Sequence, residues 1–180
     1  MMSRFLLALA FATFASSAVA AEHPYAGFGD RQIKAMSPDE IAALAEGQGF
    51  SQALAAELNG FPGPRHVLDL ADRLALDSAQ RAAIETLFDN MQVEAVAAGE
   101  AVLEAEADFD RAFREGTITE DEVAAAAEEI GRLRGILRGI HLRYHLRTKT
   151  LLTPHQVALY NAARGYSAEG HGAHGSHTAQ

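Results

Sequence analysis

The sequence predicts an all-α protein whose centre is a long antiparallel helical hairpin with short flanking helices. Alanine is very common, and the β-branched residues nowhere alternate over the length of a strand, a composition that favours helices. Two long segments carry apolar or small residues at heptad spacing, as packed helices do. The loop between them is only about four residues long, so the second helix must fold back along the first.

Residues 1–21 have the features of a signal peptide. Arg4 supplies a positive charge, an apolar run follows from Phe5 to Phe14, and Ala18-Val19-Ala20 is a site for signal peptidase, with cleavage after Ala20 or Ala21. The apolar run is shorter than the ~20 residues of a membrane-spanning helix, although an N-terminal anchor is the alternative. We therefore expect an exported protein in the periplasm, with no transmembrane span after signal cleavage. The chain has no cysteine, so packing alone must stabilise it.

The composition and motifs of the mature chain exclude several classes of function. Its formal net charge moves from −9 to about −10 when Arg4 is removed, whereas nucleic-acid binding requires a basic surface. There is no cysteine nucleophile, no Gly-x-Ser-x-Gly turn, no His-Glu-x-x-His and no phosphate-binding glycine loop. We expect a protein that is not an enzyme and does not bind nucleic acid.

An N-terminal extension with short helices is expected over residues 22–63. After a weakly ordered lead, Ser37-Pro38 begins a helix that ends at Glu46, with Glu40 placed for a capping box. A second short helix is expected over 51–58, and Phe61-Pro62-Gly63-Pro64 forms a rigid turn. A third helix, over 64–74, begins the main helical domain, which extends to residue 166.

The first long helix begins at Asp77, where Gln80 completes a capping pair, and ends near residues 114–116. Its apolar stripe comprises Ile84, Met91, Ala98, Ala105 and Ala112 at one heptad position and Phe88, Ala95, Val102 and Phe109 at the other. Thr119 and Glu122 cap the second long helix. Its stripe comprises Val123, Ile130, Leu137, Tyr144 and Leu151, with Ala126, Leu133 and Ile140. A last short helix begins at Thr153-Pro154 and ends near residues 163–165.

The two long helices carry opposite charge. Nearly all charged residues between Glu85 and Glu129 are acidic, and none between Gly131 and Ala168 is. Folding about residue 117 predicts the pairs Glu85 with Lys149, Glu94 with Arg138 or Arg143, and Glu100 with Arg132 or Arg134. Each exposed pair is worth only about 0.2–1 kcal/mol, so these pairs would set register more than stability. The alternative is two solvated faces without pairing.

Two similar motifs precede helices of the main domain. Leu152-Thr153 with Gln156, and Leu76-Asp77 with Gln80, each combine a leucine anchor, a capping residue and a glutamine that reaches back to the cap. The first resembles the Leu-Thr-x-x-Gln motif of the Spy/CpxP family of periplasmic stress proteins. The second differs by having Asp for Thr, although Asp caps equally well.

The resemblance covers residues 64–166, and the same group includes zinc-resistance-associated proteins and periplasmic heavy-metal sensors. It implies a homodimer of helical hairpins that form a curved cradle. It also implies a chaperone for unfolded envelope proteins, a heavy-metal-binding (zinc or copper) resistance protein, or both. The alternative is a periplasmic metal sensor or regulator that docks on the periplasmic sensor domain of a membrane signalling protein.

Histidines are the candidate metal ligands. The tail over residues 167–180 is too rich in Gly, His, Ser and Ala to build a core and should be disordered; His171, His174 and His177 within it could together bind zinc or copper. The alternative is a solubilising tail. His141 and His145, four apart on one helix face, are a weaker candidate. Arg134, Arg138 and Lys149 share that face, so a basic surface stripe is the favoured interpretation.

Gly131, Gly135 and Gly139 recur every four residues in the second long helix. Each costs roughly 1 kcal/mol against alanine inside a helix. They could form a ridge where another helix approaches closely, for example across a dimer. The alternative is a tolerated weak segment or a bend.

Overall fold

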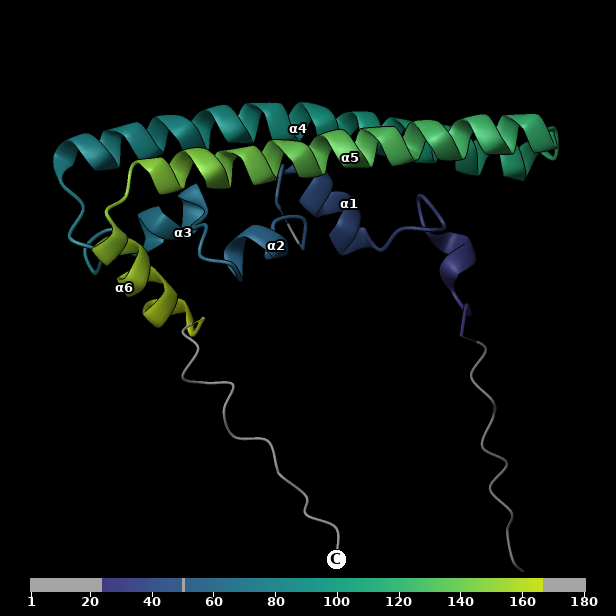
Figure 1. Cartoon of the computed structure of the whole chain (residues 1–180). Helices are drawn as coiled ribbons and strands as arrows, with labels where there is room; N and C mark the ends of the chain where they lie inside the picture. The colour runs from purple at the N-terminus through teal and green to yellow at the C-terminus, as the bar shows by residue number, and fades with distance from the viewer. Residues whose placement is uncertain (1–23, 50, 167–180) are drawn as a thin grey trace, which may run out of the picture.

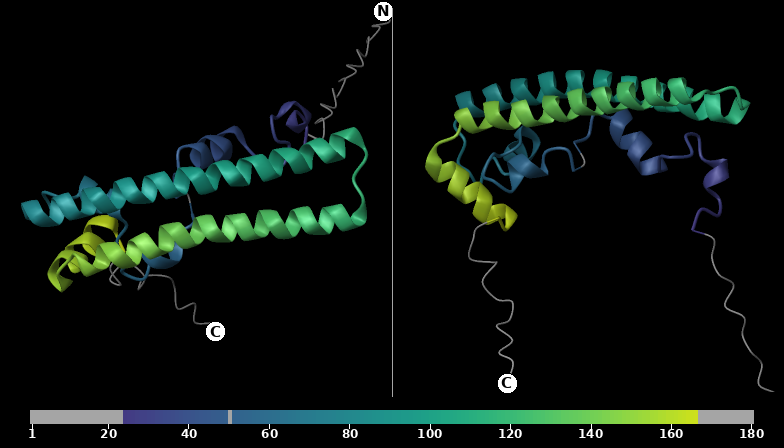
Figure 2. Two further views of the ribbon diagram at one scale, coloured as in Figure 1. Left: turned by 90° about the horizontal axis from the view of Figure 1, so that it is seen from above. Right: turned by 45° about the vertical axis from the view of Figure 1, so that its right-hand side comes forward.

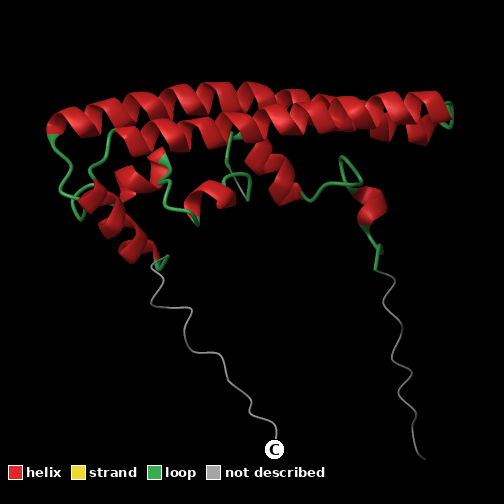
Figure 3. Ribbon diagram, in the orientation of Figure 1, coloured by secondary structure: helices red, strands yellow, loops and turns green. Residues whose placement is uncertain are grey.

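A computed structural model describes residues 24–49 and 51–166, and this part of the chain is all-helical (Figures 1 and 3). The predicted signal peptide and the tail histidines lie outside the described residues. In order, the elements are a 3₁₀ turn, three short helices, the two long helices and a last short helix. Their bounds are η1 Phe28–Asp30, α1 Pro38–Ala45, α2 Leu54–Glu57, α3 Pro64–Asp69, α4 Ser78–Glu115, α5 Glu120–Thr150 and α6 Pro154–Arg164.

The predicted antiparallel hairpin is confirmed, since α4 and α5 run side by side along their lengths (Figure 2). Gly116 ends α4 in the left-handed conformation, with φ 68°, and Thr119 with Glu122 forms the capping box of α5. The heptad stripes face the interior. The buried members are Ile84, Met91, Ala95 and Val102 on α4 and Ile130, Leu137, Ile140 and Tyr144 on α5.

The short helices all lie on one side of the hairpin (Figure 1). Ile33, Met36 and Leu44 enter the same buried core as Met91 and Leu137, so the N-terminal segment completes this core. Gly99 permits the close approach of α1 to α4, because a Cβ there would lie 2.1 Å from the carbonyl oxygen of Leu44. Within the described ranges, no helix combines the length and the apolar character of a bilayer-spanning segment.

Two short helices are shorter than predicted. The helix expected over 51–58 is regular only at Leu54–Glu57, and the one expected over 64–74 ends at Asp69. The chain must turn between α3 and α4 before the cap at Asp77, and it does so through consecutive turns in which Ala75 has a φ of 49°.

The charge pairing between the long helices is partly as predicted. Arg143 pairs with Glu94 across the hairpin. The expected pairing of Glu100 is wrong, since Arg134 binds Glu106 at 2.7 Å and Glu40 of α1 at 3.2 Å, and Arg132 pairs within its own helix. Lys149 places its Nζ 3.7 Å from the centre of the Phe61 ring. The N-terminal segment therefore competes with α4 for the cations of α5.

Candidate functional site

The two leucine–glutamine motifs meet at the open end of the hairpin. Asp77 and Thr153 each form a complete capping box, as predicted. The side-chain amides of Gln80 and Gln156 also bond each other reciprocally, with both N···O distances 2.9 Å. Each amide further donates to a backbone carbonyl from outside its own capping box. We call this contact the glutamine pair; it fixes α6 to the start of α4.

The leucines of the motifs anchor the same region. Leu152 is buried and Leu76 is partly buried, and both pack in a second core cluster with Ile84 and Tyr160. The motifs therefore have a structural role at this end of the molecule. A ligand-binding role has to be sought elsewhere.

α5 carries His141 and His145 one turn apart, and both imidazoles are buried. Their exposed fractions are 2% and 6%, so the favoured interpretation as a basic surface stripe is wrong. The segment before α3 packs against this face of α5 at two glycines. A Cβ on Gly49 would lie 3.3 Å from Nδ1 of His141, and one on Gly63 would lie 2.8 Å from Nε2 of His145. Backbone without side chains thus covers both rings.

The hydrogen bond of His145 determines which of its nitrogens is free. Nδ1 lies 2.7 Å from the carbonyl oxygen of Phe61. Because a carbonyl can only accept, Nδ1 carries the hydrogen, and in the neutral ring Nε2 keeps its lone pair. A metal-binding histidine is held in the same way, with one ring nitrogen donating to a carbonyl and the other facing the ion.

His141 lacks a comparable hydrogen bond in the described part of the chain. Its Nε2 is buried and has no hydrogen-bond partner within the described part of the chain. Burial, and secondly the neighbouring His145, lower the pKa of His141, so the ring is neutral at pH 7. A buried polar atom without a partner costs about 1–3 kcal/mol, so an orphaned nitrogen needs a physical explanation.

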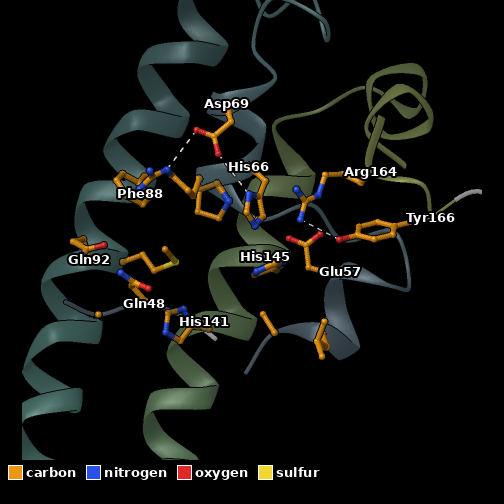
Figure 4. A pocket seen from close by; sticks show the side chains of 18 residues that line it. Gln48, Glu57, His66, Asp69, Phe88, Gln92, His141, His145, Arg164 and Tyr166 are labelled. Atoms are coloured by element: carbon orange, nitrogen blue, oxygen red, sulfur yellow. Dashed lines mark hydrogen bonds and ion pairs between the residues drawn. The ribbon is translucent and has the colours of Figure 1, made fainter. Parts of the chain in front are cut away.

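Both histidines line an open cavity of about 480 Å³ bordered by α4, α5, the segment from Gly47 to Asp69 and the end of α6 (Figure 4). We call it the histidine cavity. Glu57, at the end of α2, lies beside it with only 7% of its surface exposed. Oε1 of Glu57 lies 3.1 Å from the position that a Cβ of Gly63 would occupy, and Nε2 of His145 borders the same position. Glycine at position 63 therefore leaves a gap between a carboxylate and an imidazole.

The rest of the cavity wall carries further charged side chains. Asp69 lies 3.4 Å from Arg65 and 3.5 Å from Nδ1 of His66. The Arg164 guanidinium donates to the hydroxyl of Tyr166 at 3.2 Å. Arg65 thus has an acidic partner, whereas Arg164 bonds a neutral hydroxyl and has a charge interaction with Glu57.

The donor set fits a transition metal such as zinc or copper. Two neutral imidazoles at positions i and i+4 can bind one ion, and a carboxylate is a suitable third ligand. Among the described residues, no three His, Asp or Glu side chains already surround a common point. Binding by three ligands would therefore require a movement of at least one side chain.

The other predicted site residues are placed as follows. Gly131, Gly135 and Gly139 are exposed, and a Cβ on any of them would meet nothing within 4 Å. The ridge is therefore open in the described chain, and its role in a dimer stays a prediction. His171, His174 and His177 lie outside the described residues.

Sequence reasoning did not single out Glu57 or Tyr160. Tyr160 is fully buried on α6, and its hydroxyl bonds the Glu57 carboxylate. The available signal was the glycines at 47, 49 and 63, which mark places where backbone approaches a side chain closely.

Comparison with known proteins identifies no relative: no family model, no curated protein and no solved structure matches this chain. The resemblance to the Spy/CpxP family therefore rests on the motifs alone.

Proposed function

We propose that the chain is an exported, non-enzymatic heavy-metal-binding protein of the periplasm, similar to Spy/CpxP stress proteins, that binds zinc or copper at His141 and His145. One observation carries the proposal. Within the described residues the buried Nε2 of His141 has no hydrogen-bond partner, and His141 lies one helical turn from a second imidazole, His145, in the wall of the same cavity.

A metal ion would satisfy this arrangement better than a proton. Burial disfavours a proton on His141, since it lowers the pKa of that ring. An ion instead uses the lone pairs of neutral imidazoles, and the carboxylate of Glu57 offsets its charge. The tail histidines His171, His174 and His177 would form a second, outer site that captures the same metals.

Calorimetric titration of residues 22–180 with zinc tests the proposal. We expect His141→Gln to weaken zinc binding at the cavity at least tenfold, because a buried ligand is lost. His155→Gln is the matched control, since His155 is exposed on α6. A chain that ends at Ser167 should keep the tight site and lose the outer one. Unchanged binding by the His141 variant, with all binding lost on truncation, would contradict the proposal.

A chaperone role is the second candidate, and the exposed apolar side chains of the hairpin favour it. Phe113 is 55% exposed near the loop and packs edge to face against Phe109. Phe109 and Ile118, with Glu122 and Glu129, line a groove of about 360 Å³. Apolar surface bordered by charge is suited to unfolded envelope proteins, and a homodimer would double it. Phe113→Ser should then reduce the suppression of client aggregation.

Pull-down from envelope extract separates a chaperone, with many clients, from a regulator with one stoichiometric membrane partner.

A further inference from the structure

Glu57 is a buried carboxylate with few donors. The Tyr160 hydroxyl lies 2.7 Å from Oε2 and 3.0 Å from Oε1 of Glu57. A phenol has one hydrogen to donate, whereas an ionised carboxylate offers about four lone-pair positions. Both oxygens of Glu57 lie within hydrogen-bond distance of this single hydroxyl, so the carboxylate cannot turn into the cavity without lengthening at least one of these contacts.

Glu57 is also the buried carboxylate that can turn toward the histidines. Its Oε1 borders the gap beside Gly63 from one side, and Nε2 of His145 borders it from the other. The second carboxylate of the cavity wall, Asp69, is engaged by Arg65 and His66 and is more exposed. Two imidazoles leave zinc short of the four ligands of a tetrahedral site.

We infer that Glu57 is a movable third ligand, shared between Tyr160 when the histidine cavity is empty and the metal ion when it is filled. The inference rests on the proposed function, since it needs an ion at His141 and His145. Binding the ion turns the carboxylate away from Tyr160, whose fully buried hydroxyl then loses its acceptor. Ion binding and the Tyr160 hydrogen bond thus compete for one carboxylate.

The competition connects the cavity to α6. Tyr160 lies one turn after Gln156, whose amide forms the glutamine pair with Gln80. When Glu57 leaves Tyr160, α6 loses one of the contacts that hold it against the rest of the chain. Metal binding in the cavity therefore changes the contacts of α6 at the open end of the hairpin. A protein that binds this end would detect whether the metal is bound.

Two substitutions separate this inference from a merely structural role, because they should change zinc affinity in opposite directions. Glu57→Gln removes the third ligand and should weaken zinc binding about tenfold or more. Tyr160→Phe removes the competitor and should tighten zinc binding severalfold. Asp69→Asn is the control for a change of cavity charge, and Tyr25→Phe, which is exposed and remote from the cavity, controls for loss of a phenol.

The measurements are calorimetric titration of residues 22–180 with zinc and the tyrosine ultraviolet difference spectrum on zinc addition. Zinc itself does not absorb, so a tyrosine difference signal reports the altered Tyr160 contact; it should vanish in Tyr160→Phe and persist in Tyr25→Phe. Circular dichroism confirms that each variant is folded. If Glu57→Gln misfolds, the opposite-direction test still stands on Tyr160→Phe.

The outcomes distinguish the inference from the proposed function. If the wild-type chain and His141→Gln bind zinc equally, the proposed function fails. If His141→Gln loses binding while Tyr160→Phe is unchanged or weakened, the histidine site stands and the shared-ligand inference is overturned.

Discussion

Gly63 illustrates how a single residue controls the site. Its φ is −85°, so the backbone does not require glycine, but a Cβ would lie 2.7–2.8 Å from the ring of His145 and 3.1 Å from Glu57. Gly63→Ala should therefore destabilise the fold by about 1–3 kcal/mol through overpacking. Urea unfolding measures this. Gly139→Ala is the matched control: its Cβ would meet nothing within 4 Å among the described residues, and it should stabilise α5 by about 0.5–1 kcal/mol. Equal effects of Gly63→Ala and Gly139→Ala on the free energy of unfolding would mean that the segment before α3 does not pack closely against His145.

The charge state of His141 predicts a dependence of stability on pH. Burial, and then His145, lower the pKa of His141 below its usual value of 6.5. Below about pH 6.5 the unfolded chain therefore binds a proton that the folded chain does not, and stability falls as the pH falls. Without metal, the urea midpoint of the wild type should drop between pH 7.5 and 5.5. His141→Gln should show a smaller drop and His155→Gln an undiminished one. A midpoint that rises on acidification would show that the folded state favours the charged ring.

At the scale of elements, the glutamine pair shows how local signals combine into a tertiary contact. Gln156→Ala removes its capping bond, its contact with Gln80 and its bond to the Leu74 carbonyl, and should cost about 1–3 kcal/mol. A double-mutant cycle with Gln80→Ala should give a coupling of at least about 0.5 kcal/mol. Glu122→Ala, which removes a capping box alone, should cost less. Additive effects of the two glutamine changes would show that the pair is not formed.

The elements also show which features the sequence predicts. Caps and heptad stripes depend on residues three to seven positions apart, so Asp77, Thr119 and Thr153 and the buried faces of α4 and α5 were predictable. The burial of His141 and His145 depends on Gly49 and Gly63, which are about 80 to 90 positions away in the sequence. From the heptad pattern we predicted α4 as the packing partner of α5. The second partner, the segment before α3, buries the histidine face, and no local pattern encodes that contact.

At the scale of the whole molecule, α5 presents an open glycine ridge beside cations, and the other half of the hairpin is acidic. An antiparallel pair of hairpins would bring these surfaces together, as the predicted dimer requires. Light scattering of residues 22–180 should give about twice the monomer mass. Gly135→Leu should reduce that mass without unfolding the monomer, because a side chain there meets nothing in the described chain. A clean wild-type monomer at micromolar concentration would contradict the dimeric cradle.

The central claim is that His141 and His145 bind one metal ion inside the histidine cavity. The most direct measurement is the anomalous difference map of crystals of residues 22–180 grown with zinc. We expect a zinc peak in the cavity, about 2.0–2.1 Å from a ring nitrogen of each histidine. Zinc peaks found only at surface carboxylates or at the tail histidines, with none in the cavity, would contradict it.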